Sequence, residues 1–186
     1  HGSYRDSAAS PEVDRQDETI VPADSNAGAA DIADKELAEI FHRALDHGIR
    51  WVALFDSCHS GSIARGLAAE AKIRFAPPLP ASGSLRSPNR GHEPVRDRHE
   101  DPPARGAVIL AAAQDQQTAQ ERLVRGKPRG RFSSALEQVL TSGAVGEPLG
   151  QMFARLRALM QAGGSLHEPA LASSAERLLQ PLGGGA

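Results

Sequence analysis

The single cysteine of the chain, Cys58, lies in the hexapeptide DSCHSG (56–61), directly after the apolar run 51–55. A run that is apolar at every position predicts a strand buried on both faces of a parallel sheet. Ligands of open α/β sheets gather outside the carboxyl ends of strands, so we expect the thiol at the rim of the sheet. A thiolate in that place is suited to nucleophilic catalysis. The alternative is that the lone cysteine is a small buried apolar residue.

A thiol nucleophile needs a base, and four histidines are candidates for that role. His1 opens the chain in an HGS tripeptide, upstream of the hexapeptide. His59 adjoins the thiol and is expected to point away from it. His42 and His47 lie on a predicted helix and are expected to face solvent. His1 is one candidate base; a second interpretation is that it is a remnant of an expression tag.

Periodicity predicts the elements that must hold these residues. Helices alternating with buried strands indicate an α/β fold. The polar segment 2–18 predicts a surface loop, and 76–105, with seven of the thirteen prolines and five arginines, predicts a flexible linker. The predicted helices are 31–47, 63–72, 132–140 and 148–161, and the predicted strands are 19–21, 51–55, 107–113 and an edge strand within 176–182.

Composition excludes several classes of protein. With 40% hydrophobic and 24% charged residues, the 186-residue chain fits one globular domain. A net charge of −2 argues against a general nucleic-acid binder, and no apolar run reaches the roughly 18–20 residues that span a bilayer. One cysteine excludes an internal disulfide and a cysteine-rich zinc site, so we predict no metal and a reducing, cytoplasmic location. The absence of an initiator Met and of a signal peptide pattern predicts a piece of a longer chain.

Several segments, in order, resemble the metacaspases, which are caspase relatives of plants, fungi, protists and bacteria. The hexapeptide DSCHSG is similar to the nucleophile segment of this family, and the HGS tripeptide is similar to its base segment. The family's segment between base and nucleophile is similar to 18–24, and the helix start that follows it is similar to 32–37. The family's small-subunit strand is similar to 110–118, and the helix after that strand is similar to 130–140. The resemblance is to the bacterial type and leaves out only about 76–105.

The resemblance implies a caspase-like three-layer sandwich with a mostly parallel central sheet. The N-terminal strands of that sandwich would precede His1 and be missing from this segment. The chain would form one caspase-like peptidase domain, 1–186. It would comprise a large-subunit-like part (1–75), the linker (76–105) and a small-subunit-like part (106–186).

The resemblance also implies a cysteine endopeptidase that works through an acyl-enzyme. Cys58 is then the nucleophile and His1 the base, while the backbone N–H groups of Gly2 and Cys58 form the oxyanion hole. Asp56 lines an acidic pocket that accepts Arg or Lys before the scissile bond; alternatively, its carboxylate caps the following turn. The expected partners are protein or peptide substrates, with no nucleic acid and no membrane.

Two departures from the family pattern concern calcium, which activates many metacaspases. Lys35 and Arg65 stand where acidic ligands are common in the family, and cations at those positions would repel the metal. Acidic residues at Asp14, Asp17 and Glu18 leave some room for it. We expect no cofactor, with activation by calcium as the open alternative.

Two other functions remain open at this point. One is a catalytically inactive caspase-like module that binds peptides or regulates assembly, and the other is an unrelated thiol enzyme such as an acyltransferase. The linker arginines indicate either self-cleavage by an Arg-specific peptidase or a tolerated surface insertion. The oligomeric state is not predicted by any of these features.

Overall fold

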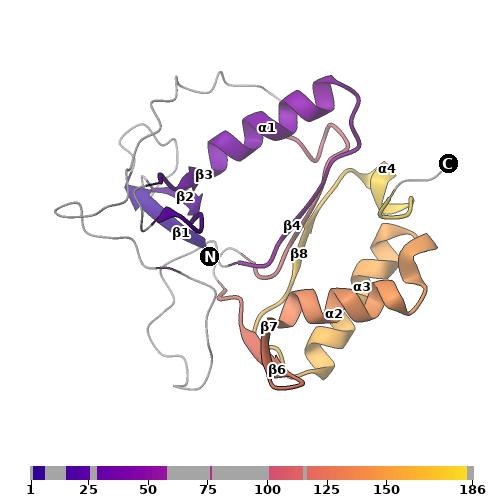
Figure 1. Cartoon of the computed structure of the whole chain (residues 1–186). Helices are drawn as coiled ribbons and strands as arrows, with labels where there is room; N and C mark the ends of the chain where they lie inside the picture. The colour runs from indigo at the N-terminus through magenta and orange to yellow at the C-terminus, as the bar shows by residue number, and fades with distance from the viewer. Residues whose placement is uncertain are drawn as a thin grey trace.

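The computed structural model describes a mixed α/β arrangement in which helices flank a small central sheet (Figure 1). The described residues are 2–6, 16–25, 29–57, 76, 101–114 and 117–183. In these ranges no helix is both long and apolar enough to cross a membrane. The predicted α/β class is confirmed. The predicted helix 63–72 and nearly all of the linker lie outside the described residues, so the division into two subunit-like parts stays a prediction.

The central sheet has the strand order β4-β5-β8, with β4 at Val52–Phe55, β5 at Val108–Ala111 and β8 at Ala170–Ala172. Strands β4 and β5 are parallel, whereas β8 pairs with β5 antiparallel. The prediction of a mostly parallel sheet is therefore wrong for the described strands, which form a small mixed sheet. A caspase-like three-layer sandwich is not established by this sheet.

The direction of β8 follows from the two helices that precede it. Helices α2 (Arg131–Thr141) and α3 (Leu149–Ala162) are joined by a short 3-10 turn, Ala144–Gly146. The Arg131 guanidinium donates a 2.8 Å hydrogen bond to the Gly163 carbonyl, which ties the start of α2 to the end of α3. The chain thus returns to the end of the sheet where β5 finished. A strand that starts there must run antiparallel to β5.

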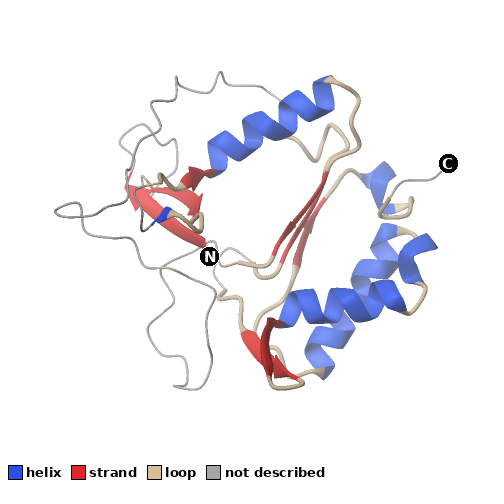
Figure 2. Cartoon of the chain, in the orientation of Figure 1, coloured by secondary structure: helices blue, strands red, loops and turns tan. Residues whose placement is uncertain are grey.

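The main core lies between the central sheet and the pair α2 and α3, on the face opposite α1 (Figure 2). Val108 and Leu110 of β5 are fully buried there. Large side chains of the two helices complete it: Phe132, Leu136, Val139, Leu149, Met152, Leu156 and Met160. The apolar stripe predicted for 148–161 is confirmed, and its period of three to four residues is the reason that α3 is helical.

Helix α1 (Asp34–Asp46) confirms the helix predicted at 31–47. The Glu36 carboxylate accepts a 2.8 Å hydrogen bond from the Ala33 N–H, which satisfies a free donor at the helix start. Phe41 is buried and its ring centre lies 5.1 Å from that of Trp51. These contacts hold α1 on the face of the sheet opposite α2 and α3.

The predicted strand at 51–55 is confirmed as β4, but its predicted burial on both faces is wrong. Leu54 is 49% exposed, although Ala53 is buried. Strand β4 pairs with β5 on one side, and no strand in the described part of the chain pairs with its other edge. Strand β5 lies between two strands and is buried as predicted at Val108 and Leu110.

A second sheet, antiparallel, consists of β1 (Gly2–Asp6), β2 (Gln16–Ile20) and β3 (Ile32–Ala33). The prediction of a loop across 2–18 is therefore wrong at both of its ends. The residues at the start of β1 are small or polar, yet Gly2 and Ser3 are buried. Since that segment lacks an alternation of large apolar and polar residues, its sequence carried no strand signal.

The C-terminal part also differs from its prediction. The expected edge strand at 176–182 is instead α4 (Ala175–Leu178) followed by a turn, and the edge strand is β8. The Ser174 hydroxyl accepts a 3.3 Å hydrogen bond from the Arg177 N–H and so caps the helix. Arg177 is buried and its guanidinium donates to the Gln180 side chain (2.7 Å) and the Leu182 carbonyl (3.0 Å). These hydrogen bonds fold the tail back on itself.

Candidate active site

The carboxyl ends of β4 and β5 meet at one edge of the central sheet. The Phe55 carbonyl accepts a 2.8 Å hydrogen bond from the Ala112 N–H, so the two parallel strands end together. Asp56 and Ser57 follow β4 directly at this edge, and Ser57 is buried. This is the place where open α/β sheets hold ligands. Cys58, the predicted nucleophile, is the next residue, but it lies outside the described residues, as does His1.

The structure places Asp56 against the first turn of α2. The Asp56 carboxylate accepts hydrogen bonds from the Ser133 hydroxyl (2.5 Å) and, at 3.4 Å, from the Ser133 N–H. A negative charge at a helix N-terminus is favourable because free N–H groups and the helix dipole point at it. Asp56 thus caps a helix that is far away in sequence.

Gly130 explains how the carboxylate reaches the helix. A Cβ atom built on Gly130 would lie 1.8 Å from an Asp56 carboxylate oxygen, which is a severe clash. Only glycine allows this approach, because any side chain at position 130 would push the carboxylate away. Neither Gly130 nor Ser133 was predicted as a site residue, because nothing local in the sequence shows which partner Asp56 meets.

The predicted oxyanion residue Gly2 is buried at the start of β1, opposite Ile20 of β2. Its carbonyl accepts a 2.9 Å hydrogen bond from the Ala76 N–H. Gly2 is therefore held by Ile20, which precedes the nucleophile segment 56–61, and by Ala76, which follows it. The oxyanion role of Gly2 and Cys58 stays a prediction, since Cys58 lies outside the described residues.

A buried histidine that the sequence analysis missed, His167, lies close to this edge. Its Nδ1 is 2.7 Å from the Ala112 carbonyl, and its Nε2 accepts a 3.3 Å hydrogen bond from the Gln120 N–H. These partners assign the neutral tautomer with the proton on Nδ1. The imidazole thereby bridges the two ends of the segment 112–120, which follows β5. No periodic signal marks His167, because both partners are distant in sequence.

Burial lowers the pKa of His167 below its ordinary value of 6.5. The Ala112 carbonyl and the negative charge of Asp56 oppose this shift, and the positive charge of Arg131 adds to it. Desolvation is the largest of these effects because a charged imidazole loses its water shell in the core. His167 is therefore neutral near pH 7 and acts as a hydrogen-bonding bridge.

His42 was predicted to face solvent, and this prediction is wrong. The side chain is buried, and its Nδ1 lies 2.9 Å from the Arg105 guanidinium, which also donates a 2.6 Å hydrogen bond to Asp46. The turn that leads into β5 thus covers the imidazole. His47 is exposed, as predicted.

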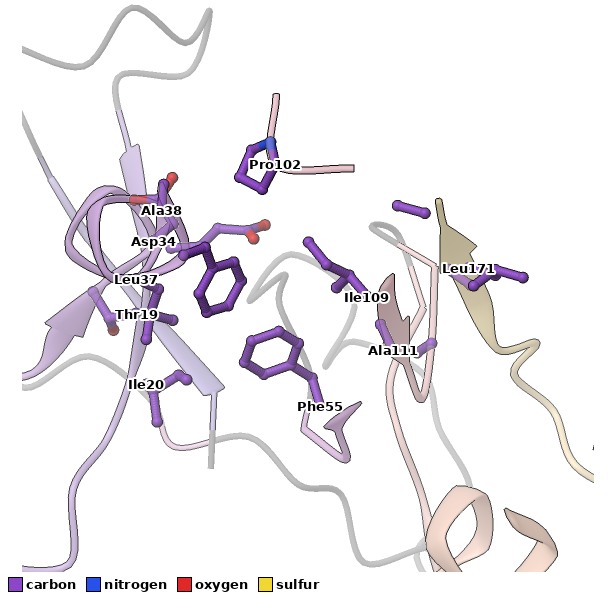
Figure 3. A pocket seen from close by; sticks show the side chains of 15 residues that line it. Thr19, Ile20, Asp34, Leu37, Ala38, Phe55, Pro102, Ile109, Ala111 and Leu171 are labelled. Carbon is purple, nitrogen blue, oxygen red and sulfur yellow. The ribbon is translucent and has the colours of Figure 1, made fainter. Parts of the chain in front are cut away.

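A separate cavity of about 450 Å³ lies under α1, on the other face of the sheet (Figure 3). Figure 3 shows Phe55 and Ile109 directed into this space, which β2 and α1 border on the opposite side. Its lining is mainly apolar, with Glu18 and Asp34 as the two carboxylates. Asp56 is not part of this lining. Among the described residues, no group of three or more His, Cys, Asp or Glu side chains is placed to hold a metal.

Comparison with known proteins concerns the segment that contains His1 and Cys58. Residues 1–65 match the model of the metacaspase, peptidase C14 domain. The N-terminal third of the chain is metacaspase-like. The matched segment carries His1, Gly2, Asp56 and Cys58, so the resemblance found in the sequence is confirmed for this region.

Curated metacaspases of fungi show the same similarity. Metacaspase-1 of Schizosaccharomyces pombe is 48% identical over 61 residues, which cover 33% of this chain and 14% of that protein. Metacaspase-1 of Saccharomyces cerevisiae is 28% identical over 172 residues, which cover 76% of this chain and 40% of that protein. The chain thus spans less than half the length of these relatives.

The fold has a likeness among solved structures. The crystal structure of protein GSU0716 from Geobacter sulfurreducens has a TM-score of 0.64 and 19% sequence identity, covering 99% of this chain and 68% of that one. At this identity the likeness concerns the fold alone. It supports the arrangement of elements described above across nearly the whole chain.

Proposed function

We propose that this chain is part of a cysteine endopeptidase that cleaves after Arg or Lys through a Cys58–His1 dyad. The observation that carries the proposal is the metacaspase match across 1–65, which contains both residues in the expected order. The position of Asp56 and Ser57 at the carboxyl ends of parallel strands supports it, because Cys58 follows at once.

In the proposed reaction, His1 takes the Cys58 proton and the sulfur attacks the substrate carbonyl carbon. A C–S bond forms, the C–N bond breaks, and the proton passes from His1 to the leaving amine. Water then hydrolyses the thioester, which releases the acid and restores the thiol. The N–H groups of Gly2 and Cys58 would stabilise the oxyanion, and one such donor is typically worth about 3 kcal/mol.

Specificity for a basic residue would come from Asp56. One face of its carboxylate is already fixed by Ser133, so the group is oriented before substrate arrives. A carboxylate held in this way is suited to a guanidinium or an ammonium group. Glycine at position 130 leaves the carboxylate the room to take this position.

The test of activity compares the full-length protein with its Cys58→Ala and His1→Ala variants on fluorogenic peptides that end in Arg, Lys or Asp, with and without calcium. We expect cleavage after Arg and Lys, lost by at least about a hundredfold in both variants. Cleavage after Asp alone would remove the proposed role of Asp56. No cleavage of any peptide would favour the inactive peptide-binding module.

The role of Asp56 needs its own control, because the carboxylate also caps α2. Asp56→Asn should abolish the preference for a peptide ending in Arg over one ending in citrulline, its uncharged isostere. Ser133→Ala removes the hydroxyl contact and leaves the carboxylate and the backbone N–H contact, so it should retain that preference. Equal loss in both variants would assign Asp56 a purely structural role.

A further inference from the structure

A basic groove lies between α2 and the β-hairpin that precedes it. The hairpin consists of β6 (Glu121–Val124) and β7 (Lys127–Gly130) and leads directly into α2 (Figure 1). Between hairpin and helix is a groove of about 630 Å³. Four cations line it: Arg122, Arg125, Lys127 and Arg129. A single carboxylate, that of Glu137, faces them.

The cations of the groove are only partly neutralised. Arg129 forms an ion pair with Glu137, and the Arg122 guanidinium donates a 2.8 Å hydrogen bond to the Ser134 hydroxyl. Arg125 and Lys127 are exposed and form no ion pair with any residue in the described part of the chain. The groove therefore carries an excess of positive charge on a chain whose net charge is −2.

The arrangement of these cations in the hairpin is energetically unfavourable. Arg122 lies directly opposite Arg129 in the register, and like charges in that position destabilise a strand pair. The two-residue turn places Arg125 at φ 51° and Gly126 at φ 75°. Both residues of such a turn favour Gly, Asn or Asp, so arginine is an unfavourable choice there. A bound anion would relieve the repulsion and use the arginine at the tip.

Strand β7 leads from the groove to the candidate active site. Its last residue, Gly130, is the one that abuts the Asp56 carboxylate. At about 3.4 Å per residue, Lys127 and Gly130 lie about 10 Å apart along the strand. An extended peptide with a basic side chain at Asp56 could thus place a residue about three to five positions away over the groove.

We propose that this groove binds Asp and Glu side chains of the substrate polypeptide, a few residues from the basic residue that Asp56 selects. The inference rests on the proposed peptidase function for its link to cleavage, but not for binding itself. Acidic peptide is favoured over nucleic acid because the groove lining contains no aromatic ring on which a base could stack.

Binding is tested on the full-length Cys58→Ala protein by fluorescence anisotropy with two labelled peptides. Each carries one Arg, and they differ only in a run of three Glu or three Gln placed three to five residues away. We expect the Glu peptide to bind about tenfold more tightly at low salt, with the difference reduced by high salt. The double variant Arg125→Gln/Lys127→Gln should lose that preference.

The matched control is Arg155→Gln/Arg157→Gln, which also removes two positive charges, here from the exposed side of α3. This variant should keep the preference, and equal loss in both double variants would overturn the proposal in favour of a bulk charge effect. The absence of any Glu preference would overturn it as well. Tighter binding of an oligothymidylate of similar length would assign the groove to nucleic acid instead.

Hydrolysis of the same peptides by the protein with Cys58 intact separates this proposal from the proposed function. Faster cleavage of the Glu peptide that depends on Arg125 and Lys127 supports both. Groove-dependent binding without cleavage of any peptide would uphold the groove as a site for acidic peptides and overturn the peptidase assignment. Cleavage that is equal for the Glu and Gln peptides, with equal binding, would leave the peptidase and overturn the groove.

Discussion

One face of the central sheet packs against α2 and α3 in the main core, whereas the other face, under α1, borders a cavity of about 450 Å³. The difference can be followed along β5, whose side chains alternate between the two faces. Val108 and Leu110 are fully buried in the packed core, and Ile109 and Ala111 line the cavity. Stability should therefore depend on the packed face, and the hollow face should tolerate changes in volume.

The two faces also differ in what holds their helices. Helices α2 and α3 are held by large apolar side chains such as Phe132 and Leu156. Helix α1 relies on the rings of Phe41 and Trp51 and on the polar contacts of Arg105. Because polar contacts near the surface contribute less than apolar burial, α1 should be the more readily displaced element.

The largest expected effect is a difference between neighbours in β5. Leu110→Ala should lower the free energy of unfolding by about 2–5 kcal/mol, because it opens a hole in a packed core. Ile109→Ala should cost less than about half as much, because Ile109 already borders empty space. Urea unfolding of both variants measures the difference. Equal losses would mean that the cavity closes in solution.

Adding volume should reveal the same asymmetry with smaller effects. Ala112 is fully buried on the packed side, so Ala112→Leu should cost about 1–3 kcal/mol through overpacking. Ala111→Leu extends into the cavity and should leave stability unchanged within about 1 kcal/mol or raise it. Thermal unfolding compares the pair. A loss at position 111 that matches the loss at 112 would contradict the asymmetry.

Acid should weaken the packed side through His167. Burial lowers the pKa of His167 in the folded chain below 6.5, the value expected for the unfolded chain. As the pH falls through 6.5, the unfolded chain takes up a proton before the folded chain does, so folding becomes less favourable. The contribution of His167 is thus complete above pH 6.5 and declines as the pH drops. Unfolding curves from pH 7.5 to 5 should lose part of this slope in His167→Gln. The exposed His47→Gln should keep it, and an unchanged slope in both would reject the role of His167.

The smallest effect is expected for the polar support of α1. Arg105→Gln removes the contacts to His42 and Asp46 and should cost about 0.5–1.5 kcal/mol, less at high salt. Hydrogen exchange should increase in α1 and stay unchanged in α3. Arg157→Gln, which breaks the exposed pair with Glu168, is the control and should change neither helix. Faster exchange in α3 after Arg105→Gln would contradict the local role of this residue.

The elements predicted correctly are those whose signal is local. Helix α3 follows from the spacing of Leu149, Met152, Leu156 and Met160, and β5 follows from an unbroken apolar run. The strands β1 and β8 were missed because each has a single large apolar or aromatic residue, Tyr4 or Leu171, and their pairing depends on distant partners. The direction of β8 depends on the Arg131–Gly163 contact, which no sequence window contains.

The candidate site divides in the same way. Asp56 and the adjoining Cys58 were found because a short motif follows an apolar run. Ser133, Gly130 and His167 were missed because each acquires its role from a contact across the fold. The close approach of Asp56 to Gly130 in particular depends on where β7 lies relative to β4. Sequence therefore indicated Asp56 and Cys58 as candidates, whose roles stay predictions, and missed the residues that position Asp56.

The parallel pairing of β4 with β5 joins the two halves of the chain by more than the covalent backbone. Four residue pairs, the capping of α2 by Asp56 and the Arg105 contacts to α1 all cross from one half to the other. A cut in the backbone after Ser57 and before Arg105 would leave all of those contacts between the two pieces. Such a nicked molecule would give two bands on a denaturing gel and still elute as one particle. Covalent continuity and structural unity are thus separate properties of this chain.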